Sequence, residues 1–167
     1  MGGMSVSEEA AAFDIQQTLR SQWEGNRRLT LRVARAFPDD QLCRFAPTAQ
    51  LRPFSAMLDE IARIELAYWR GLAEDRWQWD PQDPPPPESA VAARAFLEDA
   101  TAYTQKAWDA VTPAMLLRPR KDPFFWGDDH RPYDWLVYCI ENEIHHRGQG
   151  YIYLRELGIE PPAFWER

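Results

Sequence analysis

The sequence predicts an all-α fold, specifically a four-helix bundle with long crossover connections. Four long stretches repeat apolar residues at helical spacing, and no segment alternates apolar and polar residues as a half-buried strand does. Proline-rich or long connectors join these stretches, which is typical of bundles with crossovers. The chain has 167 residues and is 45% hydrophobic, so we expect one domain over residues 1–167.

The first helix is expected over residues 7–37. Ser7 is the candidate N-cap, and Pro38 with the two aspartates after it should stop the helix. The pair Gly25 and Asn26 indicates a kink or a close approach of another segment. The second helix is expected from about Pro53, which is tolerated in a first turn, to Trp77.

The third helix is expected over residues 88–111, with Ser89 as its cap. A proline run at residues 80–87 precedes it and should form a stiff crossover. Residues 112–131 are expected to be a long loop, and such loops are usually functional or packed against the fold. In that loop Phe124, Phe125 and Trp126 are expected to cover one end of the bundle.

The fourth helix is expected over residues 133–158 and has polar residues within its apolar stripe. Its apolar positions are Leu136, Cys139, Ile140, Ile144, Tyr151, Leu154 and Leu157. Glu143 and Arg147 are four residues apart in the same stripe, so we expect them to form an ion pair. Asn142 and His146 have the same spacing and should project together toward a neighbouring helix. Glu141 and His145 should face solvent.

Composition excludes some classes of function. The net charge of −7 disfavours nonspecific nucleic-acid binding, which needs a basic surface. No run of about 18 apolar residues is present, so we expect no membrane span, and the first residues do not read as a signal peptide. The cysteines Cys43 and Cys139 form no CxxC motif, which favours a reduced, cytoplasmic protein. Aromatic residues make up 13% of the chain, and together with the resemblance described next they favour a homodimer.

Two segments carry a resemblance to a known family. The segment ENEIHHRGQGYIYLRELGIEPP, at residues 141–162, resembles the last helix of the DinB/YfiT-like superfamily. The segment MLDEIARIELAYW, at residues 57–69, is similar to that family's second helix. The resemblance implies a four-helix bundle that is often dimeric and that in many members binds a divalent metal. It also implies either transfer of a low-molecular-weight thiol in detoxification, or a DNA-damage-inducible stress protein of unassigned activity.

The same resemblance implies a candidate metal site. The family's three histidine positions correspond here to Glu60, Asn142 and His146, so only His146 keeps the family residue. This set could bind Zn, Ni or Mn, but an amide oxygen is a weak ligand for such metals, so we expect weak or absent metal. His146 is also the candidate catalytic residue. The alternative is a core histidine hydrogen-bonded to Glu60.

Three functions therefore stay open. The first is a metal-assisted transfer of a low-molecular-weight thiol to an electrophile, with Glu60, Asn142 and His146 in the pocket. The second is a non-catalytic, stress-associated binding protein that has lost its metal. The third is a metal-independent hydrolase or isomerase in which His146 and Glu60 act as an acid–base pair.

Overall fold

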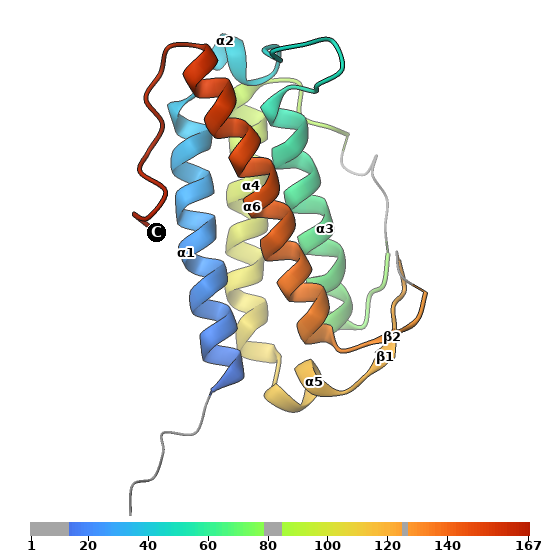
Figure 1. Cartoon of the computed structure of the whole chain (residues 1–167). Coiled ribbons are helices and arrows are strands. Elements are labelled where there is room, and N and C mark those ends of the chain that lie inside the picture. The colour runs from blue at the N-terminus through green and yellow to red at the C-terminus, as the bar shows by residue number, and fades with distance from the viewer. Residues whose placement is uncertain (1–13, 79–84, 125–126) are drawn as a thin grey trace, which may run out of the picture.

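The computed structural model describes residues 14–78, 85–124 and 127–167. Four long helices lie side by side in it and confirm the predicted bundle (Figure 1): α1 (Ile15–Ala36), α3 (Phe54–Glu74), α4 (Ala90–Ala107) and α6 (Pro132–Glu156). Helix α3 packs against α4 and α6, and α1 packs against α6. Within the described chain, no helix is both long enough and apolar enough to cross a membrane.

Helix α1 begins at Ile15, where the side chain of Asp14 accepts a hydrogen bond of 2.9 Å from the backbone N–H of Gln17. The predicted cap Ser7 lies outside the described residues. Helix α1 ends at Ala36, before Pro38, as predicted, and residues Asp39–Leu42 then form a separate short helix, α2. Proline is tolerated immediately before a first helical turn, since its missing N–H is not needed there.

Helix α3 starts after Pro53, as predicted, but ends at Glu74, before Trp77. Asp75 follows in the left-handed region, with φ of 54°, which terminates the helix. Ser89 caps α4, as predicted, by accepting a 3.2 Å hydrogen bond from the N–H of Ala92. The helical path continues to Ala110 through the 3-10 turn η1 (Trp108–Ala110).

The long segment between α4 and α6 contains more structure than the predicted loop. It forms the short helix α5 (Pro113–Leu117) and the antiparallel strands β1 (Arg120–Lys121) and β2 (Asp129–His130). Phe124 lies edge-on to Tyr68, with ring centroids 5.2 Å apart, and so covers this end of the bundle as expected. Phe125 and Trp126 lie outside the described residues.

Helix α6 turns most of its predicted apolar stripe inward, with one exception. Leu136, Cys139 and Leu154 are buried, whereas Ile144 is 42% exposed, so its assignment to the inner face is wrong. Gly150 allows α6 to approach α3 closely, because a Cβ atom there would lie 2.7 Å from the Phe54 ring. Gly158, with φ of 74°, follows the helix as the predicted terminator.

The C-terminal tail runs back along α1 (Figure 1). Glu166 accepts a 2.7 Å hydrogen bond from Arg32, and a Cβ atom on Gly25 would lie 3.3 Å from that of Arg167. Gly25 therefore marks a close approach of the tail. Phe164 and Trp165 are 62% and 72% exposed, so the described contact that holds the tail is the ion pair of Glu166 with Arg32.

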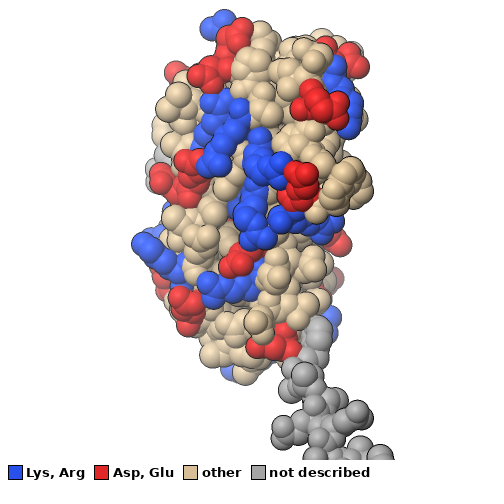
Figure 2. Space-filling model, turned by 90° about the vertical axis from the view of Figure 1, so that its left-hand side faces the viewer, with Lys and Arg blue, Asp and Glu red and all other residues tan. Residues whose placement is uncertain are grey.

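The side of the molecule with α1 and the tail is shown in Figure 2, where basic side chains gather in the middle and acidic ones lie beside them. Three exposed or half-buried α1 arginines form ion pairs: Arg20 with Glu24 and Asp109, Arg32 with Glu166, and Arg35 with Glu98. This face therefore mixes both signs of charge.

Candidate functional site

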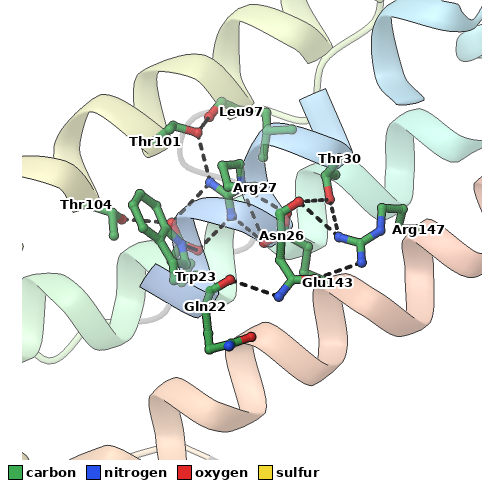
Figure 3. A network of polar contacts seen from close by, with 11 residues as sticks. Gln22, Trp23, Asn26, Arg27, Thr30, Leu97, Thr101, Thr104, Glu143 and Arg147 are labelled. Carbon is green, nitrogen blue, oxygen red and sulfur yellow. Dashed lines mark hydrogen bonds and ion pairs between the residues drawn. The ribbon is translucent and has the colours of Figure 1, made fainter. Parts of the chain in front are cut away.

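Arg27 is the centre of a buried network of charges between α1, α3, α4 and α6 (Figure 3). Its Nη2 atom lies 2.7 Å from Glu65 Oε2 and 3.0 Å from Glu143 Oε2, and its Nη1 atom donates to the hydroxyl of Thr101. The side chains of Arg27, Glu65 and Glu143 are at most 1% exposed. Burial alone would lower the pKa of Arg27, but the charges of Glu143 and Glu65 raise it above its ordinary value. Arg27 therefore remains a cation.

Glu65 is held by more than Arg27. It accepts hydrogen bonds of 2.8 Å from the indole N–H of Trp23 and from the hydroxyl of Thr104. Burial raises the pKa of Glu65, and the charge of Arg27 opposes that rise. A buried carboxylate requires such partners, because leaving one unpaired is costly. The network is consistent with a structural role, since every partner within it is a side chain of the bundle core.

Arg147 does not bond Glu143, contrary to the prediction from their spacing. It donates instead to the backbone oxygen and the side-chain oxygen of Asn26, at 3.0 and 2.8 Å, and to Thr30 at 3.1 Å. Burial lowers the pKa of Arg147, and the charge of Glu143 opposes this effect. Both carboxylate oxygens of Glu143 accept hydrogen bonds from Arg27, so Arg27 is the ion-pair partner that Arg147 was expected to be.

The three candidate metal positions do meet, on the side of the bundle between α3 and α6. His146 Nε2 lies 2.9 Å from Glu60 Oε1, and the amide of Asn142 donates to the same oxygen at 3.2 Å. The His146 side chain is 7% exposed and that of Glu60 is 28% exposed. Helical spacing explains the meeting: Asn142 and His146 are one turn apart on α6, and both face α3.

Arg52 completes the surroundings of Glu60. It forms an ion pair with Glu60 Oε2 from the connector before α3. The hydrogen bond from His146, followed by those from Arg52 and Asn142, outweighs burial and lowers the pKa of Glu60 to about 2. Glu60 is therefore fully ionised at neutral pH, and both of its oxygens have partners.

One buried polar atom beside His146 lacks a hydrogen-bond partner. Asn142 Oδ1 is buried and has no hydrogen-bond partner among the described residues. On the other side of the imidazole, Gln149 Nε2 lies 3.4 Å from His146 Nδ1 and 3.0 Å from His145 Nε2. His145 itself is exposed, as predicted.

A pocket of about 310 Å³ opens beside Glu60. Its wall combines acidic, basic and apolar groups, namely Arg52, Ser55, Ala56, Asp59, Glu60, Arg63, Pro86 and Pro87. Arg63 is paired with Asp59 at 2.8 Å, so the charged groups of the wall are already neutralised in pairs. The volume is at the lower end of what small-molecule sites occupy. Glu60 belongs to this wall, whereas His146 lies behind it.

Sequence reasoning missed Arg27, Arg52 and Asp122. Arg27 could have been found, because it follows Trp23 by one helical turn on the buried side of α1. Arg52 precedes its helix and carries no periodic signal. Asp122 accepts a 3.0 Å hydrogen bond from the Tyr68 hydroxyl, a contact that depends on the fold of the long connector. In that connector Asp128 and Asp129 are exposed.

The fold and these contacts define a class of protein: a helical bundle with a buried Glu–Arg–Glu network and a histidine–carboxylate pair beside a lateral pocket. The comparisons with known proteins agree with the resemblance. The sequence profile of the DinB family matches residues 4–167, and the chain belongs to that family.

Two solved structures are similar to this chain. A DinB-like protein from Bacillus subtilis is 20% identical, with a TM-score of 0.70 over 90% of this chain and 99% of that one. A DinB-like protein from Bacillus cereus is 18% identical, with a TM-score of 0.72 over 88% of this chain and 95% of that one. At these identities the likeness shows the shared fold. No curated protein matches the chain.

Proposed function

We propose that this chain is a DinB-family protein that binds a small molecule in the pocket beside Glu60 and works without a tightly bound transition metal. One observation carries the proposal. Glu60 lines the pocket, yet its two oxygens are already bonded, Oε1 to His146 and Asn142 and Oε2 to Arg52. A cation at this carboxylate would have to compete with these three donors and with the positive charge of Arg52.

The donor atoms do not fit a tight metal site. The imidazole nitrogen is hydrogen-bonded to the carboxylate, and the guanidinium of Arg52 places a positive charge where a cation would have to approach. Across the described residues, no group of three histidine, cysteine, aspartate or glutamate side chains is placed to hold a metal ion. An amide oxygen in place of imidazole further weakens binding of first-row metals.

Acid–base catalysis by the His146–Glu60 pair is less favoured by the same geometry. A carboxyl group whose pKa is lowered to about 2 accepts protons poorly at neutral pH. Glu60 lines the pocket and His146 does not. The pair therefore serves to hold the pocket wall in one conformation.

Metal-dependent transfer of a low-molecular-weight thiol is the second candidate. It is favoured by the buried oxygen Asn142 Oδ1, which has no partner in the described part of the chain and would be satisfied by an ion. A thiol-consumption assay with an electrophile, run with and without added Zn or Mn, tests it. Metal-dependent turnover that is lost in His146→Ala would establish this function in place of the first.

Two measurements test the first proposal. Elemental mass spectrometry of tag-free protein, after dialysis against a chelator, should find no stoichiometric Zn, Ni or Mn. Native mass spectrometry against a metabolite extract should find a small ligand whose binding is lost in Ala56→Trp, because the indole fills the pocket.

Ala92→Trp is the matched control, because Ala92 is exposed on α4 and does not line the pocket. It should bind the ligand as the parent does. A chelator-resistant stoichiometric metal, or ligand binding that is unchanged in Ala56→Trp, contradicts the proposal.

A further inference from the structure

A second pocket, of about 420 Å³, lies at the end of the bundle that carries α5 and β1. Figure 1 shows this end opposite α2. Leu72, which lines the pocket, follows Glu60 along α3 by about 18 Å of helix, so this pocket is separate from the one beside Glu60. Among the described residues, its wall combines apolar groups with two cations and no acidic group, namely Leu72, Met115, Arg118, Pro119 and Arg120.

The backbone of residues 118–120 directs both arginines to one side. Arg118 is extended, with φ of −77° and ψ of 113°, and Arg120 belongs to strand β1. Pro119 favours this conformation, because a proline disfavours helical geometry in the residue before it. Side chains two residues apart in an extended segment project to the same face. Both arginines therefore line the same pocket.

The donors of these two arginines are largely unused. Arg118 is exposed and has no ion-pair partner within the described chain. Arg120 lies 3.9 Å from the carboxylate of Asp75, whose side chain is 86% exposed, so this ion pair is long and well solvated. The guanidinium of Arg120 also lies over the Trp77 ring, 4.3 Å from its centroid. That contact uses the face of the guanidinium and leaves its in-plane N–H groups available.

We propose that this pocket binds a small molecule that carries an oxyanion, a carboxylate or a phosphate, on an apolar body. Guanidinium groups match the geometry of such oxygens and bind them through paired N–H···O bonds. The positive charges of Arg118 and Arg120 repel each other at one pocket, and an anion bound between them replaces that repulsion with attraction.

The rest of the wall fits the apolar body of the ligand. Leu72 is 6% exposed and Met115 is 37% exposed, so a ligand that covers them removes apolar surface from water. The flexible thioether side chain of Met115 can adapt to the shape of the ligand. The volume of the pocket lies within the range of small-molecule sites. A bare inorganic ion would leave Leu72 and Met115 uncovered, so both parts of the ligand contribute to binding.

Isothermal titration calorimetry of the full chain with octanoate and with octyl phosphate, each below its micelle-forming concentration, tests the ligand class. At least one of the two should bind as a single molecule per chain. Its Kd should be roughly tenfold or more below the Kd of octanol, which lacks the anion, and of acetate or inorganic phosphate, which lack the apolar body. The tighter of the two identifies the preferred oxyanion. Binding no tighter than that of octanol, or binding of many molecules per chain, overturns the proposal.

Three variants locate the binding. Arg118→Gln should raise the Kd of the tighter ligand roughly tenfold, because it removes a charge-assisted hydrogen bond. Arg44→Gln is the matched control, since Arg44 is an exposed arginine just after α2, at the other end of the bundle, and its loss changes the net charge equally. Ala56→Trp fills the pocket beside Glu60. Both of these variants should bind the ligand as the parent does.

Two results from these variants overturn the proposal. One is a Kd in Arg118→Gln that equals the Kd of the parent. The other is a Kd that rises in Arg44→Gln or Ala56→Trp as much as in Arg118→Gln, because the anion would then bind elsewhere or respond only to net charge.

Discussion

The imidazole of His146 and the carboxylate of Glu60 lie 2.9 Å apart, with the histidine buried behind the carboxylate. The pair joins α6 to α3 at the positions where the family resemblance implies metal ligands. Because Arg52 bonds the other oxygen of Glu60, a protein cation and an imidazole occupy both sides of this carboxylate. This relationship explains why we propose a small-molecule pocket rather than a tight metal site.

Removing Glu143 should destabilise the fold far more than removing Glu141. Glu143→Ala leaves the buried Arg27 with one carboxylate partner instead of two, and loss of a buried ion-pair partner costs about 3–5 kcal/mol. Glu141 is exposed, so Glu141→Ala should change the free energy of unfolding by less than about 0.5 kcal/mol. Urea unfolding of both variants measures the difference, and equal midpoints would contradict the network.

Stability should carry an acid-dependent contribution from Glu60. Its pKa is lowered in the folded state to about 2 from an ordinary value of 4.5, so the folded form binds the proton less readily. The contribution is complete above pH 4.5 and is lost as the pH falls toward 2. Solvent screening at this partly exposed carboxylate limits it to about 1–2 kcal/mol.

The comparison that isolates this contribution is between the parent and Glu60→Gln. The difference in free energy of unfolding between the two should be constant near neutral pH and should shrink below pH 4.5. A difference that stays the same down to pH 3 would show that Glu60 is not held by these hydrogen bonds.

The two cysteines should differ in reactivity. Cys139 is 5% exposed, and burial raises the pKa of its thiol well above the ordinary value, so little thiolate is present. Cys43 is only partly buried. A disulfide reagent should therefore modify one thiol in the native protein and two after unfolding. Cys43→Ser should abolish the native reaction, and a fast native reaction in that variant would contradict the burial of Cys139.

Restoring imidazole at the family positions should create a metal site. Glu60→His with Asn142→His would add two imidazoles beside His146, in a place where the native side chains already contact one another. Three imidazoles are a sufficient protein ligand set for Zn that leaves one position open. Elemental analysis should find Zn in the double variant and little in the parent. A folded double variant that takes up no more Zn than the parent would contradict the prediction that imidazoles at these three positions can hold a metal ion together.

Much of the candidate site could be anticipated from spacing along the chain. Asn142 and His146 lie one turn apart, so any helix places them on a common side, and the structure brings Glu60 to both. Arg52 could not be anticipated, because it precedes its helix and reaches Glu60 through the path of a connector. The same limit applies to Asp122, whose contact with Tyr68 depends on how the long connector folds.

The sequence by itself determined the class of fold, because helical periodicity fixes which side chains share a face and proline runs fix where helices cannot continue. Only the tertiary structure decided the partner of each inward charge. Glu143 and Arg147 share a face at pairing distance, yet Arg27, 116 residues away from Glu143, takes the carboxylate, and Arg147 turns to Asn26. The rotation and height of α1 against α6 set these contacts. Those quantities arise from packing of the whole bundle, so local spacing does not contain them.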